Sequence, residues 1–265
     1  NATTTDALTL TVNGTTATAA NLAILNGKTS VDVTVNATEV TGTFAELKTV
    51  YVDATKADFL ALGNENIVIT DDSIAANIDT IANATTGKVT ATLAAITAIS
   101  DATVTALTHV NGTTDVISFT AAASTTADAT ALVALAAKVI TADATAFNSV
   151  VTIKELAAEI GTNGAAVVSA LNIAGNDVAV SFTDAGVISA ASADAIADAT
   201  SGVVTAVVTA GTAAALNAAL VDSGAQVNAY TLTVSDTGSV KATDLTGLDG
   251  KTSVAVDASA VTAIS

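Results

Sequence analysis

Five amino-acid types are missing from this 265-residue chain: cysteine, methionine, tryptophan, proline and arginine. Without cysteine there is no disulfide framework, no thiol chemistry and no cysteine-ligated metal. The single histidine, His109, excludes sites built from several imidazole ligands. Strand ladders need every backbone N–H group, which proline lacks, so the absence of proline favours extended β pairing.

Positive charge is also scarce. The chain has 25 acidic and eight basic residues, the eight are all lysine, and the formal net charge is −17. A polyanion without arginine is poorly suited to phosphate backbones, so we expect no nucleic-acid partner. Enzymes that cleave acidic polysaccharides on a β-helix need basic side chains to stabilise negative charge. The scarcity of such side chains predicts that the chain is not an enzyme.

The apolar residues are abundant but small. Hydrophobic residues make up 51% of the chain, and 61 alanines with 47 threonines account for about two fifths of it. The composition is nearly constant from end to end, and no linker-like stretch interrupts it. We therefore expect one continuous segment over residues 1–265, built from thin and closely spaced layers.

One stretch, Ala199–Val221, carries no charge and is long enough to resemble a membrane span. Threonine, serine and asparagine interrupt it, its first part is β-branched and its second part is rich in alanine and leucine. We interpret it as a strand followed by a helix and expect no membrane span.

Internal repeats are the strongest signal in the sequence. Three pairs of segments match: Asn26–Val31 with Asp249–Val254, Ile81–Gly87 with Ile196–Gly202, and Ile96–Ser100 with Val261–Ser265. The residues that follow Ser100 resemble the N-terminal residues. A segment like the beginning of the chain could therefore follow Ser265 in the same way. We therefore expect a window of a longer tandem array.

The repeats contain a shorter period of strand-like and helix-like runs. Strand-like runs rich in valine, isoleucine and threonine begin near Leu8, Val31, Val50, Ile67, Val89, Val116, Val139, Val178, Val203, Tyr230 and Val254. Alanine and leucine recur at helical spacing in Ala127–Lys138, Thr152–Ile160, Ser192–Ala199 and Thr212–Val221. Units of roughly 20–25 residues cannot bury an apolar face alone but can do so when stacked. The sequence therefore predicts a repeat solenoid, with a parallel β-sheet stacked from these coils and short helices or turns on the other side, between a β-solenoid and an α/β-solenoid.

Two motifs resemble catalytic or nucleotide-binding elements. Gly27-Lys28-Thr29 and Gly250-Lys251-Thr252 look like the end of a phosphate-binding loop. Such a loop needs another glycine five residues earlier, where this chain has leucine, so we interpret both motifs as turns. His109 would act as a general base only beside a serine and an aspartate brought to it by the fold. We predict no catalytic and no cofactor-binding residue.

Aspartates recur near the ends of the predicted strands. Capping of turns and helices is the preferred interpretation, because aspartate is well suited to both. The alternative is a shared calcium site, because Ca²⁺ prefers several carboxylate and carbonyl oxygens. The Gly-Gly-x-Gly-x-Asp nonapeptide of calcium-binding β-rolls is absent. The calcium candidates are Asp53, Asp71, Asp72, Asp143 and Asp257, and Asp184 occupies a similar position.

The chain resembles long tandem-repeat surface proteins of bacteria. The resemblance lies in the Asn/Asp-Gly-Lys-Thr-Ser-Val-x-Val segments, the Val-Thr-Ala-Ile-Ser segment and a sequence rich in alanine, threonine and aspartate. These are giant cell-surface, surface-layer and adhesin proteins of marine and cyanobacterial lineages. The resemblance implies an acidic, cysteine-free chain that is exported unfolded, an extracellular location at the cell surface, and a scaffolding or adhesive role.

These observations predict a non-enzymatic structural segment of an extracellular filament, surface layer or stalk. An uncapped repeat exposes a strand edge, so we expect copies to associate with one another end to end. The alternative is an adhesin or tail-fibre module that binds a cell-surface receptor or glycan. Clustered exposed aromatic residues would favour the alternative, but the seven aromatic residues are thinly spread.

Overall fold

The computed structural model describes residues 6–53, 57–119, 121–123, 125–139, 147, 150–160, 164–175, 177–221 and 227–265. The chain divides into two compact units. The first unit comprises residues 1–95, 102–120 and 134–146, and the second comprises residues 96–101, 121–133 and 147–265. That the chain is one segment of a longer tandem array stays a prediction.

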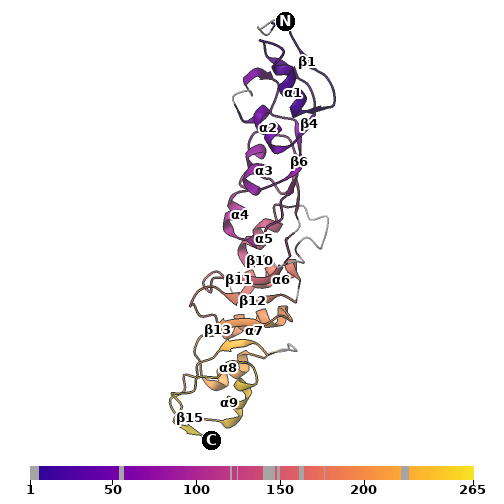
Figure 1. Ribbon diagram of the computed structural model, residues 1–265. Helices are drawn as coiled ribbons and strands as arrows, with labels where there is room; N and C mark the ends of the chain where they lie inside the picture. Colours follow the sequence, from indigo (N-terminus) through magenta and orange to yellow (C-terminus); the bar gives the residue numbers. More distant parts are fainter. Residues whose placement is uncertain are drawn as a thin grey trace. The chain divides into compact units, whose positions relative to one another are not determined.

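Short helices alternate with single strands or pairs of strands along the chain (Figure 1). They are α1 (Ala19–Asn26), α2 (Phe44–Tyr51), α3 (Ala75–Ala82), α4 (Asp101–Thr105), α5 (Ala129–Ala136), α6 (Ala165–Ala174), α7 (Ala190–Ala199), α8 (Ala213–Ala219) and α9 (Ala242–Asp249). Helices this short are marginal in isolation, so packing against their neighbours stabilises them. In the first unit α1 packs on α2 and α2 on α3, and Figure 1 shows these three helices in succession beside β4 and β6.

The first unit contains two parallel sheets. The three-stranded sheet has the order β1 (Thr11–Val12), β3 (Val33–Val35), β5 (Phe59–Leu60). The five-stranded sheet has the order β2 (Thr16–Thr18), β4 (Glu39–Gly42), β6 (Asn66–Ser73), β7 (Val89–Leu93), β9 (Val116–Phe119). Up to β6 the chain therefore contributes strands alternately to one sheet and to the other.

The second unit also contains two parallel sheets. The six-stranded sheet has the order β14 (Ala229–Thr231), β13 (Val204–Val207), β12 (Ala179–Phe182), β11 (Val150–Glu155), β10 (Thr125–Asp128), β8 (Ala98–Ile99). The two-stranded sheet pairs β15 (Ser239–Val240) with β16 (Ala263–Ile264). Buried aliphatic residues line the inner faces of the strands and helices in both units, and the largest fully buried side chains are the two tyrosines, Tyr51 and Tyr230.

The prediction of one stacked solenoid sheet is wrong. The described residues form an α/β fold with four separate parallel sheets of three, five, six and two strands, and none of these sheets is closed or solenoidal. Paired residues are 22 positions apart in one ladder (Ile67 and Val89) and 28 apart in another (Ala98 and Thr126). The register also changes within a single ladder, because the pairing of β6 with β7 shifts between Val68 and Asp72. The near-identical layers that a solenoid needs are therefore missing.

Two predicted elements have the other secondary structure. The strand expected near Val50 is helix α2, because Thr43 and Glu46 form a capping box that starts a helix. The Thr43 side chain accepts from the Glu46 backbone N–H at 3.4 Å, and the Glu46 carboxylate accepts from the Thr43 N–H at 2.9 Å. The helix expected over Thr152–Ile160 begins instead as strand β11, because its β-branched residues pair with β10 and β12.

The uncharged stretch Ala199–Val221 contains strand β13 followed by helix α8, which confirms its interpretation as two elements. None of the helices in the described ranges has the length and apolar character that crossing a bilayer requires.

Candidate functional site

Recurring threonine hydroxyl groups connect segments that lie about 20 residues apart in the chain, within the same compact unit. The Thr200 hydroxyl donates to the Val178 carbonyl oxygen at 2.7 Å and accepts from the Gly202 backbone N–H at 2.8 Å. We call this arrangement a threonine bridge. It recurs at Thr29, Thr85 and Thr252, whose hydroxyls donate to the carbonyl oxygens of Leu8, Glu65 and Tyr230 at 2.6, 2.8 and 2.6 Å. In each case the acceptor lies 20 to 22 residues earlier in the chain.

The threonine bridges account for the Gly-Lys-Thr motifs. Gly27 and Gly250 are the C-caps of α1 and α9, and the lysine N–H that follows each glycine donates to a carbonyl of the helix end. Thr29 and Thr252 then form bridges. The interpretation of both motifs as turns is confirmed.

Carboxylates form a second type of connection, from a later strand or loop back to the start of an earlier helix. Asp71 of β6 accepts from the Phe44 N–H, the first residue of α2, at 2.8 Å. Asp236 accepts from the Ala213 N–H at the start of α8 at 2.7 Å. A carboxylate is favourable there because the first N–H groups of a helix have no partner within it and the N-terminal end of its dipole is positive.

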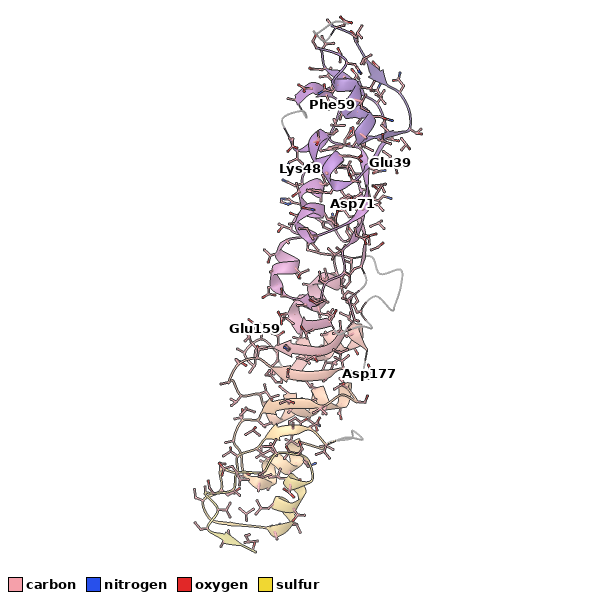
Figure 2. The ribbon with its side chains drawn as sticks, in the orientation of Figure 1. Glu39, Lys48, Phe59, Asp71, Glu159 and Asp177 are labelled. Carbon is pink, nitrogen blue, oxygen red and sulfur yellow. The ribbon has the colours of Figure 1, made fainter. Side chains whose placement is uncertain are left out.

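The calcium candidates do not come together in the described part of the chain. Lys48 forms an ion pair with Asp53, whereas Asp71 accepts from the first residue of α2, and Figure 2 labels Lys48 and Asp71 at separate points of the first unit. Asp257 accepts from the Ser259 N–H at 3.0 Å, and this hydrogen bond lowers the pKa of Asp257 below its ordinary value. The carboxylate of Asp184 also accepts from a backbone N–H, that of Ala157, at 3.1 Å. Capping is thus confirmed for Asp71 and Asp257.

Two calcium candidates need a separate account. Asp72 is exposed in strand β6, and Asp143 lies outside the described residues. Among the residues described, no group of three or more histidine and carboxylate side chains has the arrangement of a metal site.

His109 has an acidic partner but no nucleophile. Its Nδ1 lies 2.8 Å from Asp79 Oδ2, and its backbone N–H donates to the other oxygen of the same carboxylate. No serine or threonine hydroxyl in the described part of the chain bonds to the His109 ring. Asp79 therefore holds the turn around His109 in place, and the two groups do not form a triad.

A buried carboxylate, Glu65, lies beside a cavity of the first unit. Glu65 is 2% exposed; its Oε2 accepts from the Gly63 N–H at 2.8 Å and from the Tyr51 hydroxyl at 3.1 Å, whereas its Oε1 has no partner among the described residues. The adjacent cavity has a volume of about 430 Å³, and asparagines 36, 64 and 66 line it. Burial, and then the neighbouring Glu65 charge, raise the pKa of Tyr51 far above its ordinary value, so the phenol stays a hydrogen-bond donor.

Removing that phenol tests the contact. We expect Tyr51→Phe to lower the free energy of unfolding by about 1.5 kcal/mol, the usual loss for a hydrogen bond to a charged group. Tyr230→Phe is the matched control, because the Tyr230 hydroxyl donates to a neutral acceptor, the Ala193 carbonyl oxygen, at 3.2 Å. We expect a loss of about 1 kcal/mol for the control. Urea unfolding followed by circular dichroism measures both, and a larger loss for Tyr230→Phe would contradict the special role of Glu65.

The second unit has a group of acidic side chains around Glu155, at the end of β11. Glu155 is buried, and its Oε2 accepts from the Thr130 N–H in the first turn of α5 at 3.0 Å. Burial, then the charges of Glu155 and Asp101, raise the pKa of Asp128. A hydrogen bond shared with Glu155 raises the pKa of Glu159. These carboxylates repel one another at neutral pH and carry no second feature that indicates a ligand.

Neutralising Asp128 should therefore stabilise the protein near neutral pH. Its raised pKa means that ionised Asp128 disfavours the folded state, and this penalty disappears below the ordinary pKa of 3.8. We expect Asp128→Asn to increase the free energy of unfolding by about 0.5 kcal/mol at pH 7, the size typical of partly exposed charge interactions. The variant and the wild type should be equally stable near pH 3. A gain of the same size at both pH values would show that charge is not its cause.

The sequence interpretation missed Glu65 and the threonine bridges. A signal for the bridges was available, because threonine occupies the same position in both members of two matched segment pairs. Nothing in the sequence marked Glu65, since its role depends on Tyr51, which lies 14 residues away on a helix that was expected to be a strand.

The chain was compared with models of protein families, with curated proteins and with solved structures, and none of them matches it. The function proposed for it therefore rests on its own residues.

Proposed function

We propose that the chain is a non-enzymatic structural segment of an extracellular bacterial assembly, such as a filament, surface layer or stalk, and that its copies associate with one another. The observation that carries this proposal is that polar side chains bind main-chain groups elsewhere in the same chain. In the threonine bridges and carboxylate caps, hydroxyl and carboxylate groups bind the main chain of segments about 20 to 27 residues away. Such internal connections are expected of a scaffold.

The sheet edges supply a means of association. Each of the four parallel sheets ends in strands that have one partner among the described residues. An unpaired strand edge presents free N–H and C=O groups to another chain. No proline removes an N–H group from these edges, although residues 252–257 already pair with part of the edge at β14.

The net charge of −17 supports both the extracellular location and the form of assembly. Like charges keep the sides of neighbouring chains apart, so contacts concentrate where strand edges meet. Salt screens this repulsion over about 10 Å at 0.1 M. We therefore expect assembly to strengthen as ionic strength rises.

Sedimentation velocity and negative-stain electron microscopy of the purified chain test the proposal. The expected result is a species distribution that grows with protein concentration and with NaCl concentration, and regular assemblies in the micrographs. A chain that stays monomeric at every concentration of protein and salt would overturn the proposal.

A second candidate function is that of an adhesin or tail-fibre module that binds a receptor or glycan. The cavity beside Glu65 favours it, because asparagine amides and a carboxylate are common hydrogen-bonding partners of polar ligands. Binding of a panel of immobilised glycans by the chain, and its loss in Asn64→Ala, would support this candidate. Equal binding by Asn64→Ala would place any glycan site elsewhere.

A further inference from the structure

The turn between β5 and β6 carries a buried carboxylate that the fold uses only in part. Glu65 lines the cavity described above, together with residues 35–38, between the end of β3 and the start of β4, and with Ala61, Asn64 and Asn66. Its Oε1 is buried and has no hydrogen-bond partner among the described residues. An unpaired buried charge is strongly destabilising, so a partner for this oxygen would stabilise the fold.

The other carboxylate oxygen already has two donors. Oε2 accepts from the Gly63 N–H at 2.8 Å and from the Tyr51 hydroxyl at 3.1 Å. Gly63 has a φ of +121°, which residues with a Cβ rarely adopt. Ala61, in the same turn, has a φ of +67°, a strained conformation that persists only where the surrounding structure holds it. The turn therefore fixes Oε2 in place and leaves Oε1 for a ligand.

The main chain on both sides of the Glu65 side chain is held as well. The Thr85 hydroxyl donates to the Glu65 carbonyl oxygen at 2.8 Å. The Asn66 N–H donates to the Thr38 carbonyl oxygen at 3.0 Å. A ligand at the carboxylate would therefore meet a group whose position is already set, which reduces the cost of binding.

Neutral oxygens line the same cavity. The Asn36 Nδ2 donates to the Asn13 Oδ1 at 2.9 Å, so this hydrogen bond does not use the amide oxygen of Asn36. The amide of Asn64 also lines the cavity. The Asn66 Oδ1, by contrast, accepts from the Lys88 N–H at 3.0 Å. Asn36 and Asn64 therefore offer oxygen ligands, and no histidine or lysine lines the cavity in the described part of the chain.

A carboxylate oxygen among amide oxygens suits a hard cation, which prefers oxygen ligands. Ca²⁺ accepts carboxylate, amide and water oxygens in a flexible geometry, whereas Mg²⁺ demands a nearly ideal octahedron. The ion pairs of the described residues join Lys48 to Asp53 and His109 to Asp79, and neither reaches Glu65. The net charge of −17 also attracts cations to the chain.

We propose that Glu65 binds Ca²⁺ through Oε1, with the amide oxygens of Asn36 and Asn64 and with water completing the shell. A single carboxylate gives low affinity, with a Kd on the order of 10⁻³ M, as in extracellular calcium modules. The site goes beyond the proposed structural function and does not depend on self-association. It differs from a cluster of several acidic side chains, because its other ligands are neutral.

Terbium luminescence tests the position of the ion. Tb³⁺ occupies oxygen sites that suit Ca²⁺ and emits when a nearby tyrosine is excited. The chain has two tyrosines and no tryptophan, and the Tyr51 hydroxyl lies 3.1 Å from Glu65 Oε2. We expect emission that Ca²⁺ displaces, measured in about 0.15 M NaCl to screen non-specific binding. Tyr51→Phe should abolish most of this emission, and the control Tyr230→Phe should retain it.

Two results of this experiment would overturn the calcium site. The first is emission that Ca²⁺ does not displace, or no emission from the wild type. The second is full emission from Tyr51→Phe, which would place the ion away from Glu65.

Glu65→Gln tests the carboxylate itself and should weaken Ca²⁺ binding by about tenfold or more. Glu155→Gln is the matched control: Glu155 is also buried, but its two oxygens accept from the N–H groups of Leu156 at 2.9 Å and Thr130 at 3.0 Å. Ca²⁺ should raise the urea midpoint of the wild type, Tyr51→Phe and Glu155→Gln, but not that of Glu65→Gln. Equal stabilisation of Glu65→Gln by Ca²⁺ would overturn the site.

Two further measurements keep the outcomes separate. Circular dichroism without Ca²⁺ checks that Glu65→Gln folds, and if it does not, the terbium result with Tyr51→Phe decides alone. Sedimentation velocity in the presence of a chelator judges the proposed structural function. Self-association there without any Ca²⁺ binding would overturn the calcium site and leave the structural function intact.

Discussion

Gly202→Ala is expected to lower the free energy of unfolding by about 3 kcal/mol. A Cβ at this position would lie 2.3 Å from the carbonyl carbon and oxygen of Val178 and 2.6 Å from the Ala179 nitrogen. These are main-chain atoms next to strand β12, and they cannot rotate away as a flexible side chain can. Relief requires β12 and β13 to separate, which also breaks the threonine bridge at Thr200. Urea unfolding followed by circular dichroism measures the loss.

Two further glycines make this prediction specific. Gly87 is equivalent to Gly202, since a Cβ there would lie 2.1 Å from the Glu65 carbonyl oxygen, and Gly87→Ala should cost about as much. Gly238 is the control, because a Cβ there meets nothing within 4 Å. Gly238→Ala should be neutral or stabilise by up to about 0.5 kcal/mol through the entropy of the unfolded chain. Equal losses at Gly202 and Gly238 would show that main-chain contact is not the cause.

The direction of strand pairing could be predicted from the sequence. Short β-branched runs that alternate with alanine-rich helical segments favour parallel ladders, and the pairings of the described strands are parallel. The strands near Ile67, Val89 and Val116 begin where their valine and isoleucine runs begin. Local composition was sufficient there because these runs are long and bounded by turn residues.

The arrangement of the strands into sheets could not be predicted in the same way. Assignment of a strand to one sheet or another depends on register, and register depends on unit lengths that vary along this chain. The sequence also does not show that β1 and β2, only three residues apart, belong to different sheets. A single solenoid sheet was the simplest interpretation of the repeats, and the four separate sheets contradict it.

The candidate calcium residues failed to converge for a related reason. Their positions near strand ends are similar in the sequence, but three of the five carboxylates bind a nearby N–H or ammonium group: Asp71 accepts from Phe44, Asp257 from Ser259 and Asp53 from Lys48. A helix start with free N–H groups is a local and reliable partner for a carboxylate. Capping therefore accounts for the positions of Asp71 and Asp257.

The threonine bridges give a structural role to Thr29, Thr85, Thr200 and Thr252, and removing one of them should have the second large effect. Thr200 is 7% exposed, so Thr200→Val leaves the Val178 carbonyl oxygen and the Gly202 N–H without the hydroxyl that joins them, in a site that water scarcely reaches. Valine has nearly the same shape as threonine, so packing changes little. We expect a loss of about 2 kcal/mol in the free energy of unfolding, the usual cost of unsatisfied buried polar groups.

A hydroxyl without the methyl group separates hydrogen bonding from shape. Thr200→Ser keeps the donor and acceptor and should recover more than half of the stability lost in Thr200→Val. Thr246→Val is the surface control: its hydroxyl donates to the Ala242 carbonyl oxygen at 2.9 Å on an exposed helix face, and the change should stay within about 0.5 kcal/mol. If Thr200→Val were as stable as the wild type, the bridges would be incidental contacts. Segments about 20 residues apart would then be held together by the strand ladders and the buried aliphatic residues alone.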